Sequence, residues 1–212
     1  MNSPLAAAQR GHLLEAALPD IAFDGWSYRA LHAAAARIGI APAEAAALFP
    51  GGAAEMVAAF SRWADGRLFD RLEAAPLDGL GVAARIALAL RLRLEVLAPW
   101  REAVRRGLSV LALPSNAPLG CRLLYETADG IWYAVGDTAT DFSFYTKRAT
   151  LAGVHAASQL YWLDDRSPGF ADTLGFIERR LASLHRLSGL RRRIEAAAER
   201  LPDPLRMLRP LR

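Results

Sequence analysis

The sequence predicts a single all-α domain, and three observations support this fold class. The 212 residues suit one domain, and the apolar content of 53% is enough to form a buried core. Alanine-rich runs such as residues 33–36 favour helix, because alanine loses no side-chain entropy when it becomes helical. No segment shows the sustained apolar–polar alternation, rich in β-branched residues, that is typical of strands.

The expected helices follow one another closely, and prolines and glycines mark most of their ends. Pro19 is expected to end the first helix, Gly39 to end the second, and Pro42 to occupy the first turn of the third. Asp78 is expected to cap the fifth helix, whereas Gly189 breaks or bends the chain after the ninth. The predicted helical ranges are 4–18, 26–38, 42–49, 53–75, 78–97, 99–113, 117–135, 143–163, 168–187 and 190–201.

Charge is distributed unevenly along the chain. The formal net charge is +4, but the segment from Arg179 to Arg212 holds ten arginines against three acidic residues and carries +7. The rest of the chain is therefore about −3, and an acidic body with a basic tail indicates an anionic partner, either a membrane or a nucleic acid. We divide the chain into an N-terminal part, a body and a basic tail: 4–50, 51–187 and 188–212.

The basic tail has the pattern of a helix that lies in a membrane interface. On a helical wheel one narrow arc of about 80° is apolar, and arginines lie outside it. The apolar residues are Leu187, Leu190, Ile194, Ala197 and Leu201. The arginines outside the arc are Arg191, Arg192, Arg193 and Arg200. Each arginine near an anionic leaflet contributes about 1 kcal/mol, so reversible attachment is expected. The alternative is a helix docked on the body of its own or a partner subunit.

The sequence contains no membrane-spanning run and no secretory signal. No uninterrupted apolar stretch reaches the 18 or so residues that cross a bilayer, and Met1–Asp20 lacks a basic region followed by an apolar one. The single cysteine, Cys121, forms no internal disulfide, which indicates a reducing compartment. We expect a cytoplasmic protein that is peripheral on the inner face of a bacterial membrane.

Catalytic motifs are absent from the sequence. The four histidines form no metal-ligand spacing, and no glutamate lies three residues before a histidine, as di-iron bundles require. No nucleophile elbow, phosphate-binding loop or dinucleotide fingerprint occurs. We therefore expect no catalytic residue, no metal and no cofactor. A lipid hydrolase or a metal-containing oxidoreductase is the rival enzymatic hypothesis.

Residues 4–49 resemble the helix-turn-helix of TetR-type repressors, in which the third helix lies in the major groove. DNA affinity depends on cations that neutralise phosphates and on side chains that bind base edges. Here the third helix has no cation, Glu44 would repel phosphate, and Arg29 and Arg37 are the only positive charges of the second. The fold is expected without the DNA function, so no nucleic-acid partner is predicted. A TetR-type transcriptional regulator is the alternative function.

Residues 131–151, together with Asp129, carry a distinctive pattern. They resemble the signature of the Coq-nine family of ubiquinone-biosynthesis proteins, roughly D-D-x-W-x-x-x-G-D-x-S-x-D-x-N-W-Y-T-[KR]-R. The similarity extends to 165–168 and 176–180, and upstream to 48–52 and 85–86, so it covers about residues 10 to 187. The sequence departs from the pattern at Gly130, Ala139, Ser143 and Phe144.

The resemblance implies a TetR-like fold, often dimeric, with an apolar cavity for isoprenoid or quinone-like lipids. Its members assist the di-iron hydroxylase that acts on demethoxyubiquinone. By resemblance, this chain is a non-catalytic accessory protein that presents a quinone precursor to that hydroxylase. We expect a homodimer with a bound isoprenoid quinone precursor or phospholipid. The patch for lipid exit and hydroxylase docking is carried onto Asp129, Trp132 and Tyr133.

Apolar and aromatic residues crowd the signature and the helix that follows it. The candidates for lipid contact are Trp132, Phe142, Phe144, Tyr145, Leu151, Val154 and Trp162. Ordinary core packing is the alternative for each of them. Lys147 and Arg148 are expected to solvate one face or to pair with Asp137 or Asp141.

Overall fold

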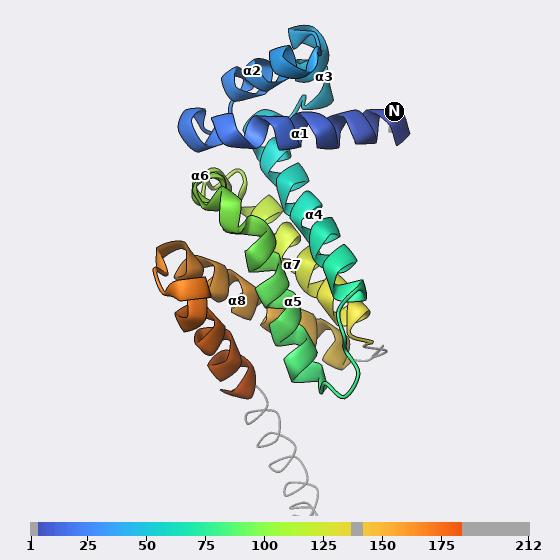
Figure 1. Ribbon diagram of the computed structural model, residues 1–212, viewed down its shortest axis with the longest axis vertical. Coiled ribbons are helices and arrows are strands. Elements are labelled where there is room, and N and C mark those ends of the chain that lie inside the picture. Colours follow the sequence, from blue (N-terminus) through green and yellow to red (C-terminus); the bar gives the residue numbers. More distant parts are fainter. Residues whose placement is uncertain (1–3, 137–141, 184–212) are drawn as a thin grey trace, which may run out of the picture.

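The computed structural model describes residues 4–136 and 142–183, and this part of the chain is helical with no strand (Figure 1). The prediction of an all-α fold is confirmed. Three helices form a unit at one end of the molecule: α1 (Pro4–Asp24), α2 (Tyr28–Ile38) and α3 (Pro42–Leu48). In Figure 1, α1 lies across this end and α2 and α3 lie above it.

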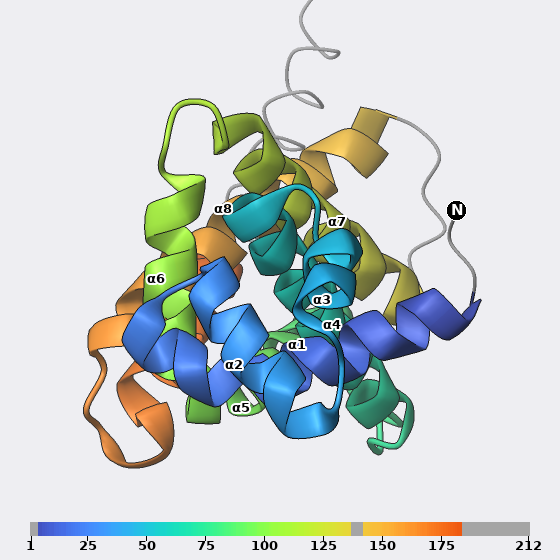
Figure 2. The same ribbon diagram turned by 90° about the horizontal axis from the view of Figure 1, so that it is seen from above.

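The remaining helices form the body beneath this unit. Their bounds are α4 (Gly52–Glu73), α5 (Val82–Leu97), the 3₁₀ turn η1 (Ala98–Trp100), α6 (Arg101–Leu111), α7 (Ala117–Ala134), α8 (Phe142–Asp164) and the 3₁₀ turn η2 (Pro168–Phe170). A further helical stretch covers residues 171–183. Figure 2, which views the molecule from above, shows α6 on one side of the bundle and α7 on the other side of α4.

Both ends of α2 have capping residues. The Ser27 side chain caps the start, where it accepts a hydrogen bond of 3.3 Å from the backbone N–H of Ala30. The predicted end at Gly39 is confirmed. Gly39 ends the helix with φ 76°, a left-handed conformation in which glycine lacks the steric penalty of other residues. Pro42 occupies the first turn of α3, also as predicted.

Two predicted helix ends are wrong. Pro19 does not end α1, which continues to Asp24. Pro19 lies on the exposed side of the helix, and Leu18 and Ile21 beside it are fully buried, so their packing outweighs the lost backbone hydrogen bond. Asp78 does not cap α5, which begins at Val82 after a loop rich in proline and glycine.

A single hydrophobic core joins the N-terminal unit to the body. It contains Leu13 and Leu31 from the N-terminal unit, Leu68 of α4, and Trp162 of α8. The core therefore continues across residue 50, where the sequence suggests a boundary. No helix within the described part of the chain is both long and apolar enough to span a bilayer. The predicted membrane residues of the tail, from Leu187 to Leu201, lie outside the described residues.

Candidate functional site

A cavity of about 460 Å³ lies between α4, α5, α6, α7 and α8. Its size falls in the range of about 300–1,000 Å³ that is usual for small-molecule sites. Most of its lining is aliphatic or small, and each of the five helices contributes. The apolar lining includes Val57, Phe60, Leu97, Ala103, Val104, Gly107, Leu108, Leu111, Leu123, Leu124 and Leu160.

Helical spacing explains why these residues share one surface. Residues four apart in a helix lie on the same face, one turn apart. Val57 and Ser61 of α4 have this spacing, as do His155 and Gln159 of α8, and all four line the cavity. The site is therefore built on rigid elements of the bundle rather than on loops.

The cavity has an exposed end near the turn between α6 and α7. Four of its lining residues are exposed: Ala112, Ala117, Cys121 and Leu160. Leu113, which lies between the two helices, is 54% exposed. The rim of the cavity at this end is therefore mostly apolar.

Another part of the lining is polar and centres on the buried pair Arg93 and Asp65. Arg93 Nε donates to Asp65 Oδ1 at 2.7 Å, and the other carboxylate oxygen accepts from Thr127 Oγ1 at 2.9 Å. Arg93 also donates to Gln159 Oε1 at 3.2 Å and to Ser61 Oγ at 3.1 Å. The side chains of Arg93 and Asp65 are only 4% and 11% exposed, so one buried cation is neutralised by one buried anion.

His155 stands beside this network and is 3% exposed. Burial lowers the pKa of His155 well below its ordinary value, and the charge of Arg93 lowers it further. The imidazole is therefore neutral at pH 7, with one nitrogen as donor and the other as acceptor. Within the described residues it makes no hydrogen bond.

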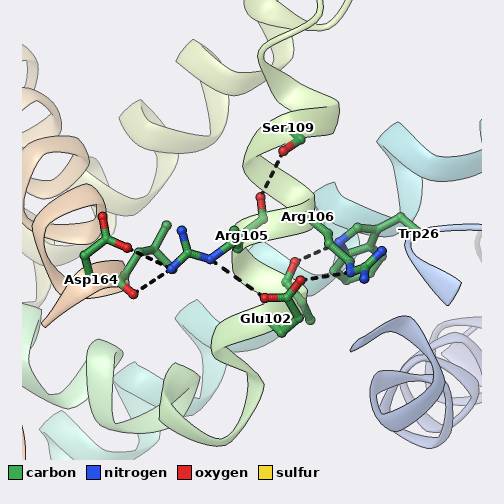
Figure 3. Close-up of polar contacts among 8 residues, drawn as sticks. Trp26, Glu102, Arg105, Arg106, Ser109 and Asp164 are labelled. Carbon is green, nitrogen blue, oxygen red and sulfur yellow. Dashed lines mark hydrogen bonds and ion pairs between the residues drawn. The ribbon is translucent and has the colours of Figure 1, made fainter. Parts of the chain in front are cut away.

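Helix α6 forms one wall of the cavity and is fixed on two sides, as Figure 3 shows. On one side, Trp26 Nε1 donates to the carbonyl of Ala103 at 2.9 Å. On the other, Arg105 Nη2 pairs with Asp164 at 3.0 Å and donates to the carbonyl of Leu163 at 2.8 Å. The wall is thus tied to both the N-terminal unit and the end of α8.

Seven residues were predicted to contact lipid, and none of the six whose side chains the structure describes lines this cavity. Leu151, Val154 and Trp162 are buried in the hydrophobic core. Arg101 covers the Trp162 ring, with its guanidinium carbon 4.6 Å from the ring centre. Tyr145 is 64% exposed, and the side chain of Phe142 lies outside the described residues. Trp132 and Phe144 are half-buried near the start of α8.

The predicted docking patch is formed where α7 ends and α8 begins. Tyr133 is 81% exposed, whereas Trp132 is half-buried. The Lys147 ammonium lies 5.3 Å from the Trp132 ring centre, in the range of a cation–π contact. Asp129 is ion-paired with Arg148. The structure therefore brings together the three residues that the resemblance selects.

Arg148 is more buried than the sequence suggests. Its side chain is 4% exposed, its guanidinium carbon lies 3.3 Å from the Phe144 ring centre, and its described carboxylate partner is Asp129. The predicted partners Asp137 and Asp141 lie outside the described residues. Arg148 thus ties α8 to α7 instead of solvating a surface.

The arrangement of the helices is that of a known fold class. The chain has a TetR-like fold: it superposes with a TM-score of 0.67 on the crystal structure of the TetR transcriptional regulator from Nitrosomonas europaea. The match covers 83% of this chain and 97% of the regulator, and 21% of residues are identical, which is evidence for the fold alone. No group of three metal-ligating side chains is present among residues 4–136 and 142–183.

The family follows from sequence comparison. The COQ9 family model matches residues 117–188. The mitochondrial ubiquinone biosynthesis protein COQ9 of Rattus norvegicus is 33% identical over 200 residues, which cover 91% of this chain and 64% of the relative. The corresponding protein of Homo sapiens is 33% identical, with coverage of 91% and 63%. The chain belongs to the COQ9 family, as the resemblance predicts, and spans slightly less than two thirds of the length of these relatives.

Proposed function

We propose that this chain is a lipid-binding accessory protein of ubiquinone biosynthesis. It holds an isoprenoid quinone precursor and presents it to the demethoxyubiquinone hydroxylase. The observation that carries the proposal is the cavity between α4 and α8, with its apolar exposed end and its buried polar end. The names of the COQ9 relatives support the pathway.

The physical need for such a protein comes from the prenyl chain. Each CH₂ group exposed to water costs about 0.8 kcal/mol, so a polyprenyl tail is insoluble unless it is shielded. A volume of about 460 Å³ corresponds to about fifteen water molecules in the liquid. This accommodates a substituted ring with a short part of its tail, and the rest of a longer chain extends past Cys121 and Leu160. Shielding and presentation require no reactive group.

The other parts of the chain supply the remaining steps of this proposal. The tail, 188–212, attaches the protein to the inner face of a bacterial membrane, from which the lipid enters. The patch of Asp129, Trp132 and Tyr133 then docks the hydroxylase, because it exposes an aromatic ring beside a paired carboxylate. A homodimer would present two such patches.

Lipids that co-purify with the full chain test the proposal by mass spectrometry. Ala156 of α8 lines the cavity, so Ala156→Phe should fill it and reduce the retained lipid several-fold. Ala149 lies on the same helix, is exposed and does not line the cavity, so Ala149→Phe is the matched control. Trp132→Ala should retain the lipid and lose stimulation of the hydroxylase. A wild-type protein that retains neither isoprenoid nor phospholipid would refute the proposal.

A TetR-type regulator is the second candidate, and the fold favours it. Helix α3 carries no cation, however, and both arginines of α2 are engaged by α1. Arg29 is ion-paired with Asp24, and Arg37 pairs with Asp20 at 2.6 Å. These contacts reduce the positive charge available to phosphates. Salt-dependent binding of the chain to duplex DNA would support the regulator instead.

A further inference from the structure

The polar end of the cavity has hydrogen-bonding capacity that the protein does not use. In Arg93, Nε, Nη1 and Nη2 each donate once, although a guanidinium has five N–H groups. Gln159 accepts from Arg93 through Oε1, and its amide NH₂ group donates to no described residue. Ser61 accepts from Arg93 and donates to no described residue. His155 has no hydrogen bond within the described part of the chain.

Most of the unused hydrogen-bonding groups at this end of the cavity are donors. Three side chains that line the cavity offer it: the imidazole N–H of His155, the amide of Gln159 and the hydroxyl of Ser61. A polar side chain inside a protein favours a site where it can form a hydrogen bond. His155 is 3% exposed and lines the cavity, so a ligand atom in the cavity can form a hydrogen bond with its imidazole.

The charge of this end of the cavity restricts the ligand further. Asp65 neutralises Arg93, and His155 is neutral, so the cluster has no net charge. An anionic head group would be desolvated there without a compensating cation, since Arg93 is already paired. A neutral ring with carbonyl, hydroxyl or ether oxygens accepts from the available donors without that cost.

We infer that His155, Gln159 and Ser61 form a head-group subsite for a neutral, oxygen-bearing ring, with its prenyl chain directed toward Cys121. The inference rests on the proposed function and specifies the orientation of the ligand: the ring is deep, beside Arg93, and the tail is at the exposed end. It also selects an isoprenoid quinone or phenol over a phospholipid.

Binding of three probes to the full delipidated chain tests this inference. The probes are a short-chain prenylated benzoquinone, a prenyl alcohol of the same chain length, and a short-chain phosphatidylglycerol below its micelle concentration. Binding is followed by quenching of tryptophan fluorescence, or by calorimetry where the probe is optically silent. Wild-type protein should bind the benzoquinone most tightly and phosphatidylglycerol most weakly.

Variants of His155 separate head-group binding from the shape of the cavity. His155→Leu should weaken binding of the benzoquinone by about three- to tenfold, the effect of one hydrogen bond. Binding of the prenyl alcohol should change little. His155→Gln restores a donor and should recover most of the affinity. Ser158→Ala is the matched control, because Ser158 is buried on the same helix, bonds the Val154 carbonyl at 2.7 Å and does not line the cavity.

The outcomes distinguish the two proposals. One outcome is that the wild type binds both prenylated probes while His155→Leu weakens the binding of both equally, or of neither. In that case the subsite is refuted and the proposal of lipid binding stands. If phosphatidylglycerol binds best and depends on His155, the neutral preference is refuted. If no probe binds the wild type, the proposed function and the subsite both fail. Circular dichroism of each variant establishes that it is folded, and His155→Gln provides the comparison if His155→Leu is not.

Discussion

Asp165 organises the turn between α8 and the helical stretch 171–183. Its Oδ1 accepts from the backbone N–H and the hydroxyl of Ser167 at 2.7 and 2.6 Å. Its Oδ2 accepts from the backbone N–H of Thr173 at 2.9 Å and from the hydroxyl of Thr173. Because all these groups donate, the turn favours the charged carboxylate, and we expect Asp165→Asn to destabilise the protein.

The pKa of Asp165 gives the magnitude of this effect. Burial of the carboxyl raises the pKa, but the hydrogen bonds from Ser167 and Thr173 outweigh burial and lower it to about 2. A decrease from 3.8 to about 2 corresponds to about 2 kcal/mol, since one pH unit is about 1.4 kcal/mol. The folded-state pKa is depressed, so this stabilisation is fully present above about pH 4 and is lost as the pH falls toward 2.

Urea unfolding followed by circular dichroism measures the effect. At pH 7, Asp165→Asn should lower the free energy of unfolding by about 2 kcal/mol, and the difference from the wild type should shrink as the pH falls from 4 to 2. Asp164→Asn is the matched control, because Asp164 is 82% exposed and makes a surface pair with Arg105 that contributes little. A difference between Asp165→Asn and wild type that is as large at pH 2.5 as at pH 7 would refute the electrostatic explanation.

Three further predictions concern the exposed end of the cavity, the tail and the packing of α7. Cys121 is the single cysteine, is exposed and lines the cavity, so bound lipid should cover it and slow its reaction with a maleimide several-fold. Equal reaction rates with and without lipid would contradict the proposal that the lipid chain passes Cys121. Deletion of 190–212 should abolish binding to anionic vesicles and leave the thermal transition of the body, whereas undiminished vesicle binding would exclude the tail as anchor. A Cβ at Gly130 would lie 2.4 Å from Cζ of Phe69, so the cost of overpacking exceeds the gain in helix propensity, and Gly130→Ala should lower the free energy of unfolding by up to about 2 kcal/mol. Gly153 has open space, so Gly153→Ala should instead stabilise by up to about 1 kcal/mol, and similar denaturation midpoints for the two variants would contradict this account.

Local sequence signals predict the fold well where the physics is local. Ser27 and Gly39 define α2 because a cap hydrogen bond and a left-handed residue depend on the nearest backbone alone. Pro19 does not end the helix because tertiary packing outweighs the local preference: Leu18 and Ile21 of the same helix are buried in the core. Asp78 fails because it lies in a turn, closed by a hydrogen bond of 3.2 Å from the Leu80 N–H to the Leu77 carbonyl, with Gly79 left-handed, and α5 begins only at Val82.

The cavity is harder to predict from sequence than the fold. A leucine that lines a void and a leucine that packs in a core occupy the same helical positions, so periodicity does not separate Leu108 from Leu94. Aromatic residues near the signature were predicted to contact lipid, but one of them, Trp162, is a core residue. The available signal is Arg93, a charge within the apolar run 86–98 whose burial requires a partner such as Asp65.

The N-terminal unit has a structural role, because it packs against the helix that forms one wall of the cavity. The Trp26 indole bonds the carbonyl of Ala103, and its ring lies 5.3 Å from the ring of Phe60, which lines the cavity. A Cβ added at Gly107 would approach Trp26 Nε1 to 3.3 Å, so α6 and Trp26 fit closely. The unit therefore supports the wall of the cavity.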